Sequence, residues 1–180
     1  RLRRAWAFAI DLDTLIAARA PGATPANGPF GKDVLGYLAN SGYPQFDLKK
    51  ASDLVDAYKK EKNVDKVEVV ISTDNVPDNQ QLVAMMKQML DKAGFSIKIA
   101  PPVDTSSLQN LVFRATGGID VYTWNWLPYT DPDTFSSFLG SAGCGGPAVC
   151  PNTQGANTLN WGRVSAGTVA PAFSARSPPA

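Results

Sequence analysis

The chain has 180 residues, of which 44% are hydrophobic and 18% are charged, and 17 lysines and arginines nearly balance 16 acidic residues. This composition is typical of one globular domain, and the net charge of +1 argues against a broad electrostatic surface for nucleic acid or anionic membrane. No apolar run approaches the roughly 20 residues of a membrane-spanning helix, and the absence of histidine excludes histidine-based catalytic triads and the usual zinc sites.

The first third of the chain is predicted to be helical, with one long loop. Apolar residues at helical spacing predict an amphipathic helix over residues 2–10, and Asp11 or Asp13 is placed to cap a second helical turn. Prolines and glycines predict a surface loop through residues 20–30. Residues 49–60 then predict a helix with one apolar face and a lysine-rich opposite face.

The middle of the chain alternates between strand and helix patterns. Strands are predicted where β-branched or alternating apolar residues occur, and helices where the apolar period lengthens. In chain order these elements cover residues 67–71, 77–93, 95–99, 104–114, 119–126 and 131–139. Crossovers of about 20 residues suit parallel pairing. The predicted fold class is therefore α/β, with a βαβαβ core and a largely parallel sheet flanked by helices. Residues 164–180 lack acidic residues and any apolar period, which predicts an irregular or disordered tail.

Two Asp-x-Asp pairs, Asp11/Asp13 and Asp131/Asp133, are the candidates for carboxylate or metal chemistry. Each pair lies at a predicted helix start, where an aspartate satisfies free N–H groups, so capping is the preferred interpretation. No phosphate-binding glycine motif follows any predicted strand. We therefore predict no enzyme activity, no cofactor and no metal site.

An aromatic segment leaves the third predicted strand at its carboxyl end, which is where open α/β sheets bind ligands. Trp124, Trp126 and Tyr129 offer flat apolar walls, and Asn125 offers one amide that could orient a ligand. The alternative is that both tryptophans share one strand face and pack beneath a helix. We expect at least one of them to contact a ligand.

The two cysteines, Cys144 and Cys150, flank a Gly-Gly-Pro-Ala-Val loop that is able to turn back on itself. A local disulfide is geometrically plausible, with free thiols as the alternative. A disulfide would indicate an oxidising compartment. A chain that begins at Arg1, with neither an initiator methionine nor a signal peptide, would suit a processed secreted protein or an excised fragment.

Five segments in a fixed order resemble one protein family. Residues 2–16 follow the pattern Val-Arg-x-Ala-x-x-x-Ala-Ile-Asp-Arg-x-x-Leu-Ile, and residues 25–29 follow Pro-Ala-x-Gly-Pro. A Tyr/Phe-Asp-x-x-Lys-Ala-x-x-Leu helix, a Lys-Ala-Gly helix end and a run of Gly-x-Asp, Trp and Asp-Pro match residues 46–54, 92–95 and 118–132. Together they resemble the peptide-binding class, family 5, of extracytoplasmic solute-binding proteins of ABC importers, which also includes nickel and oligosaccharide binders.

The resemblance implies a protein of two lobes that close on a ligand. Residues 1–163 look like most of the second lobe, so the chain is expected to be a fragment of a protein close to three times longer. It implies capture of a small solute, such as a peptide or an oligosaccharide, for an ABC permease in the membrane. The full-length protein is expected to be a monomer that is periplasmic or a cell-surface lipoprotein, with no nucleic-acid partner.

Site residues carry over unevenly from this family. Arg114 matches a position where some oligopeptide binders carry an arginine that faces the carboxylate end of the ligand; a plain helix-end arginine is the alternative. The family's ammonium-binding aspartate after the strand tryptophan is replaced here by residues 127–129, and Thr123 stands where a second arginine is found. The cleft is therefore expected to be more neutral and aromatic than that of a peptide binder, which also suits a sugar, a lipid headgroup or a capped peptide on Trp124 or Trp126.

Two other functions stay open on the sequence. One is a non-transporting regulator or interaction protein of the cell envelope with the same fold. The more distant one is a carboxylate-dependent hydrolase that uses Asp131 and Asp133.

Overall fold

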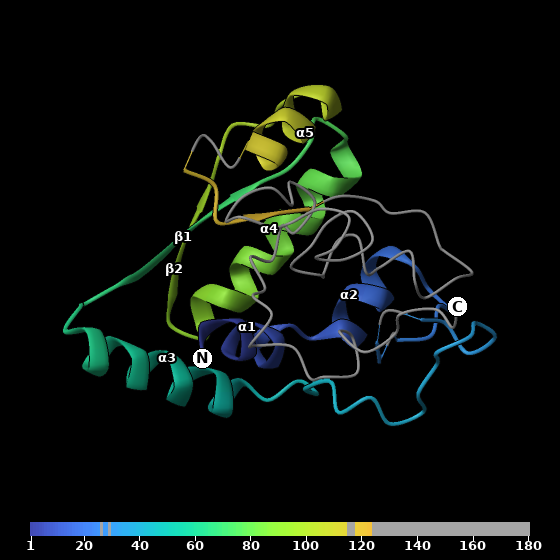
Figure 1. Cartoon of the computed structure of the whole chain (residues 1–180), viewed down its shortest axis with the longest axis horizontal. Coiled ribbons are helices and arrows are strands. Elements are labelled where there is room, and N and C mark those ends of the chain that lie inside the picture. The colour runs from blue at the N-terminus through green and yellow to red at the C-terminus, as the bar shows by residue number, and fades with distance from the viewer. Residues whose placement is uncertain (26, 29, 115–117, 124–180) are drawn as a thin grey trace, which may run out of the picture.

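The computed structural model describes residues 1–25, 27–28, 30–114 and 118–123 (Figure 1). In chain order its elements are α1 (Leu2–Ala9), α2 (Leu12–Arg19), α3 (Leu48–Lys62), β1 (Val67–Ser72), α4 (Pro77–Lys92), β2 (Phe95–Ile99), α5 (Thr105–Arg114) and β3 (Val121–Tyr122). The strands form a parallel sheet in the order β2-β1-β3. This arrangement confirms the predicted α/β class. In this part of the chain, no helix has the length and apolar character needed to cross a membrane.

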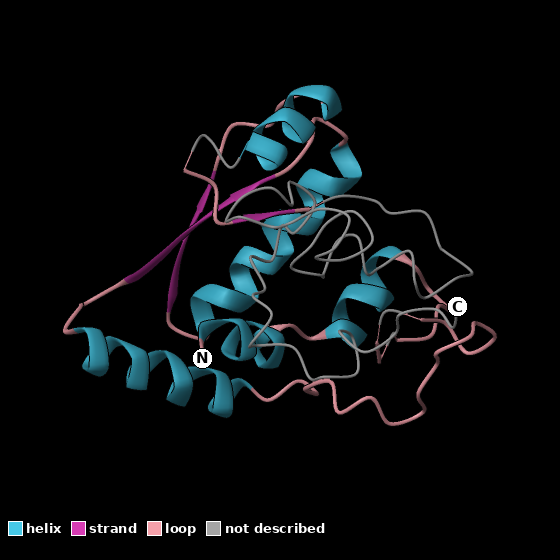
Figure 2. Cartoon of the chain, in the orientation of Figure 1, coloured by secondary structure: helices cyan, strands magenta, loops and turns pink. Residues whose placement is uncertain are grey.

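The central strand β1 makes very different contacts along its two edges. It pairs with β2 over five positions, from Val67 opposite Phe95 to Ile71 opposite Ile99. Among the described residues, it pairs with β3 over two positions. Since β2 and β3 lie on opposite sides of β1, right-handed crossovers carry α4 and α5 to opposite faces of the sheet. Figure 2 shows α1 and α3 together at the end of the molecule that lies opposite α5.

One apolar core lies between the sheet and helices α1, α3 and α4. Its fully or almost fully buried members come from the three helices and from the side of β1 and β2 that faces them: Ala5, Ala9, Ala51, Val55, Val67, Val69, Ile71, Val83, Leu90, Ala93, Phe95 and Ile97. Alanines at the contact between α1 and α3 let the two helices approach closely. Trp6 packs edge-on against Phe95, with ring centroids 5.8 Å apart, and so fixes α1 on β2.

Aspartates begin three of the helices. The carboxylate of Asp11 accepts hydrogen bonds from the backbone N–H and the hydroxyl of Thr14, at 3.1 and 2.6 Å. Asp47 and Asp104 accept the equivalent backbone bond from the residue three positions ahead. The side chain of that residue, and then its backbone N–H, lowers the pKa of each of the three carboxyls. The predicted cap at Asp11 is confirmed.

The third strand begins later than its apolar pattern predicts. The prediction started it at residue 119, whereas β3 begins at Val121. At this position the side chain of Asp120 takes the place of a backbone acceptor: its Oδ2 accepts from the Val70 N–H at 2.9 Å, while the Asp120 N–H donates to the Val70 carbonyl at 3.0 Å. The predicted continuation of this strand to residue 126, the helix at residues 131–139 and the tail at residues 164–180 lie outside the described residues.

Replacing Ile71 by alanine tests whether β1 is the centre of the core. Ile71 is 0% exposed, so Ile71→Ala should lower the free energy of unfolding by about 2–5 kcal/mol through lost burial and a cavity. Ile99, directly opposite on β2, is 42% exposed, and Ile99→Ala should cost less than about 1 kcal/mol. Urea unfolding followed by circular dichroism measures both. Equal losses would contradict the assignment.

The Asp11 cap predicts a pH-dependent stability difference. Thr14 holds the pKa of Asp11 below its ordinary value, chiefly through its hydroxyl, so the carboxylate stabilises the fold above the ordinary aspartate pKa. Asp11→Ala should cost about 1 kcal/mol at pH 7, and the difference from the parent chain should shrink as the pH falls through the lowered pKa. The control is Asp13→Ala, which removes a first-turn charge without removing the cap. A loss for Asp11→Ala that is constant from pH 7 to pH 3 would refute this account.

Candidate functional site

Polar side chains gather at the carboxyl ends of β1 and β3. Ser72, Thr73 and Asp74 follow one another where β1 ends, and each is at most 5% exposed. Asn79 in the first turns of α4 is 2% exposed, and Thr123 directly follows β3. We call these five residues the strand-end cluster. Buried polar groups need hydrogen-bond partners, so the contacts inside the cluster show which of its polar atoms are bonded to one another.

Hydrogen bonds between β1 and β3 join the two strands at their ends. The backbone N–H of Thr123 donates to the Ser72 carbonyl at 3.1 Å. One residue further along β1, the Thr123 hydroxyl donates to the hydroxyl of Thr73 at 2.8 Å. The chain therefore leaves β3 at the carboxyl edge of the sheet, with a pair of hydroxyl groups at the point of departure.

A buried carboxylate lies beside this hydroxyl pair. Oδ1 of Asp74 accepts from Nδ2 of Asn79 at 2.8 Å and from the backbone N–H of Val76 at 3.3 Å. Both donors belong to the beginning of α4, where the helix dipole also favours a negative charge. These contacts offset the cost of burying Asp74. The Thr73 carbonyl accepts from the N–H of Val103 at 3.4 Å, which ties the loop after β1 to the loop after β2.

The position of the strand-end cluster in the topology favours ligand binding. The connections that leave β1 and β2 run to opposite faces of the sheet, and ligands of open α/β sheets bind at such switch points, outside the carboxyl ends of the strands. The buried members of the cluster bond to one another, and Thr123 is its partly exposed member, with a hydroxyl that suits recognition of a polar group. Among the described residues, no three acidic or cysteine side chains are grouped as a metal ion would need.

Tyr122, the last residue of β3, lies next to the cluster. Partial burial of this side chain raises the pKa of its phenol to about 12, so the ring is neutral at physiological pH. Tyr122 thus adds an uncharged aromatic surface at the same edge of the sheet.

The described residues reach the strand end from which the predicted aromatic segment continues. The roles predicted for the side chains of this segment stay predictions. Trp124, Asn125, Trp126 and Tyr129 lie outside the described residues, immediately after Thr123. Cys144 and Cys150 also lie outside them. Arg114 is the last residue of α5, and its side chain is not among those described.

Sequence reasoning missed the contribution of β1 to this edge. Ser72, Thr73 and Asp74 directly follow the β-branched run of the first predicted strand. Polar residues at the end of a predicted parallel strand were the available signal, since such ends meet at one edge of the sheet.

Comparison with known proteins identifies the family. Residues 1–147 match the model of the bacterial extracellular solute-binding proteins, family 5 (middle region). The chain belongs to this family. Family 5 is one of substrate-binding proteins and not of enzymes, which favours solute binding over the hydrolase and regulator alternatives. A search of curated proteins found no match.

Solved structures share the fold at low sequence identity. The ABC transporter substrate-binding protein CtaP from Listeria monocytogenes is 20% identical, with a TM-score of 0.70, over 91% of this chain and 31% of that one. Listeria monocytogenes OppA bound to peptide is 20% identical, with a TM-score of 0.66, over 92% and 32%. NikZ from Campylobacter jejuni in complex with Ni(L-His) is 22% identical, with a TM-score of 0.65, over 90% and 32%. The chain thus spans about a third of the length of these structures.

A double-mutant cycle tests the hydroxyl pair that joins the two strands. Thr73→Val or Thr123→Val alone leaves one hydroxyl without its partner and should cost about 1 kcal/mol of unfolding free energy. The double variant replaces both hydroxyls by methyl groups and should cost less than the sum of the two losses. Urea unfolding measures all four proteins. Strict additivity would show that the two hydroxyls do not interact.

Proposed function

We propose that residues 1–163 are the second lobe of a two-lobe substrate-binding protein, which captures a small solute outside the cytoplasm and delivers it to an ABC permease. The observation that carries the proposal is the strand-end cluster, in a chain of this family, at the edge where the aromatic segment begins. The cluster and Tyr122 would form one wall of the cleft, and the other lobe would form the opposite wall. Residues 164–180 would be a tail outside the lobe.

The chemistry of this edge favours an uncharged polar ligand with a flat apolar face. Thr123, which is partly exposed, presents a hydroxyl that the buried Thr73 hydroxyl holds in place, and Tyr122 is a neutral ring. In the proposed cleft Trp124 and Trp126 stack on the ligand, while Asn125 and Tyr129 orient it. Oligosaccharides and capped peptides fit this description.

Arg114 and the cysteines refine the proposal. If Arg114 at the end of α5 reaches the cleft, it would pair with the carboxylate end of a free peptide. OppA, one of the structures with this fold, is bound to peptide. A Cys144–Cys150 disulfide would belong to an extracytoplasmic protein, whether periplasmic or anchored as a lipoprotein. The full-length protein would work as a monomer with its permease.

Capture by closure predicts that the 180-residue chain alone binds weakly. One wall of a cleft buries only part of a ligand. The contacts that the other lobe would add are missing and the ligand stays partly hydrated, so the affinity is lower. We expect dissociation constants of about 1 mM or weaker for this chain.

Ligand-observed NMR of the 180-residue chain tests the function. The probes are maltotriose, acetyl-dialanine-amide and free trialanine, which separate sugar, capped peptide and charged peptide. At least one probe should show saturable transfer of magnetisation, and Trp124→Ala or Trp126→Ala should reduce the transfer at least about threefold.

Trp161→Ala is the matched control, because Trp161 lies beyond the segment that matches the family. It should leave the transfer unchanged. The proposed site is wrong if all three variants behave alike, and solute binding by this lobe is unsupported if none of the three probes shows transfer.

A further inference from the structure

Strand β2 lies at one side of the sheet, and its outer edge faces away from β1. Among the described residues, β1 is the strand with which β2 pairs. The Ala100 N–H, directly after β2, donates to the Ile71 carbonyl of β1 at 2.8 Å. Backbone groups of successive residues point to alternate edges of a strand, so those of Ser96 and Lys98 also point to β1, and those of Ile97 point to the outer edge.

Two side chains of α4, the helix that packs on β2, bond to the outward groups of Ile97 (Figure 1). Oδ1 of Asp91 accepts from the Ile97 N–H at 3.1 Å, and Nζ of Lys87 donates to the Ile97 carbonyl at 2.7 Å. Nζ of Lys87 also donates to Oδ2 of Asp91 at 2.8 Å. The three residues thus form a closed ring of hydrogen bonds, in the place where a neighbouring strand would bond.

The Lys87–Asp91 ion pair has more to offer at this position than stability. The two side chains are 38% and 40% exposed, and ion pairs with this degree of exposure contribute little to the free energy of unfolding. Its specific effect is on the backbone of Ile97, because both the donor and the acceptor of that residue are already bonded. A strand edge with bonded groups cannot pair fully with another strand.

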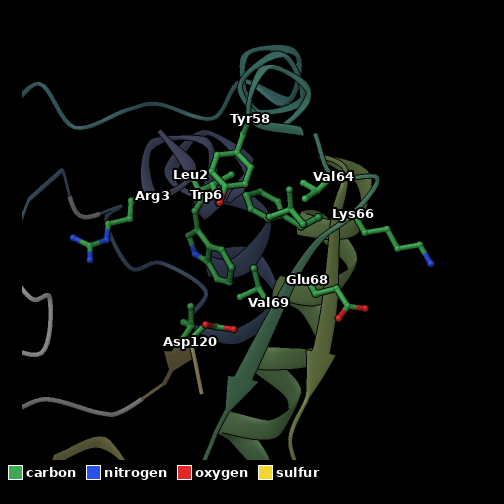
Figure 3. Close-up of a pocket in the computed structure, with 12 residues that line it drawn as sticks. Leu2, Arg3, Trp6, Tyr58, Val64, Lys66, Glu68, Val69 and Asp120 are labelled. Atoms are coloured by element: carbon green, nitrogen blue, oxygen red, sulfur yellow. The ribbon is translucent and has the colours of Figure 1, made fainter. Parts of the chain in front are cut away.

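Without the ion pair, the outer edge of β2 would suit the same edge of a second copy. A two-fold axis brings identical strand edges together in antiparallel pairing. With the axis at Ile97, each Ile97 would exchange two backbone bonds with its counterpart, and Lys98 would lie opposite Ser96. No like charges within β2 would then face each other. Lys98 is also neutralised within its own chain, because it donates to the Glu68 carboxylate at 2.9 Å. Figure 3 shows the Glu68 side chain extending from β1 in the direction of β2.

We propose that Lys87 and Asp91 close the outer edge of β2: by occupying the N–H and the carbonyl of Ile97, they prevent this edge from pairing with the β2 edge of a second copy of the chain. The pair therefore keeps the sheet from joining two copies. It lies outside the strand-end cluster, so the inference does not depend on the proposed ligand.

Removing both charges at once tests the proposal. Lys87→Ala/Asp91→Ala opens the edge and leaves the net charge unchanged. The matched control is Lys49→Ala/Asp53→Ala, which removes an ion pair of the same spacing, at 2.7 Å, from α3. In analytical ultracentrifugation, the average mass of the open variant should rise at least about 1.5-fold between about 50 µM and 1 mM, and that of the control should stay constant.

Hydrogen exchange measured by NMR locates the contact. At about 50 µM the Ile97 amide should exchange at least about tenfold faster in the open variant than in the parent chain, because its acceptor is gone. The exchange should slow again at higher concentration, when a second copy covers the amide. Adding Ser96→Lys to the open variant places a lysine opposite Lys98 of the second copy. This addition should restore a constant mass while the Ile97 amide still exchanges fast.

Constant mass and unchanged exchange at Ile97 in the folded open variant would overturn the inference. So would equal association of the α3 control, since the loss of any helical ion pair would then have the same effect. Association that persists after Ser96→Lys would place the contact on another surface. If circular dichroism shows that the open variant does not fold, Lys87→Met decides. It keeps the Asp91 bond and frees the carbonyl alone, so its mass should still rise with concentration, and a constant mass would refute the proposal.

Discussion

β1 is the strand around which the sheet and the apolar core are built. It is hydrogen-bonded to β2 along one edge and to β3 along part of the other, and its Val67, Val69 and Ile71 face the apolar core. Helices α1, α3 and α4 bury their apolar faces against that core, so none of them has a stable position without this strand. The two edges of β1 differ near its carboxyl end and its amino end: the carboxyl end is joined to β3 by hydrogen bonds, whereas among the described residues no strand pairs with that edge at Glu68.

The polar end combines rigidity with a capacity for recognition. Asp74 is held by donors from the start of α4, and Thr73 is held by Thr123 from a strand fifty residues away in the chain. Groups that are already fixed lose little conformational entropy when a ligand arrives, and this favours affinity from a small number of contacts. A lobe that moves as a rigid body needs such a fixed wall if closure is to bring the same atoms to the ligand each time.

Local patterns predicted most of the described fold, and contacts distant in sequence account for the rest. The spacing of Ala5 and Ala9, and the β-branched run from Val67 to Ile71, are properties of neighbouring residues, so periodicity found these elements. The start of β3 was misplaced because the bond between Asp120 and Val70 exists only after the chain has folded. The burial of Thr73 was likewise invisible, since a polar residue after a strand reads as an exposed loop until α4 and β3 cover it. The aromatic segment came from its position after a strand and from the family resemblance, and of its surroundings the structure describes the strand end at Thr123.

The two hydrogen bonds between Asp120 and Val70 have a consequence for the alignment of the sheet. A strand of two residues has few backbone bonds with which to resist sliding along its neighbour, and a slide of one residue would turn each side chain to the other face. Ile119 and Val121, the residues on either side of Asp120, carry no carboxylate with which to occupy the Val70 N–H after such a shift. Asp120 therefore fixes the register of β3 against β1, and with it the position of Thr123 at the carboxyl edge of the sheet.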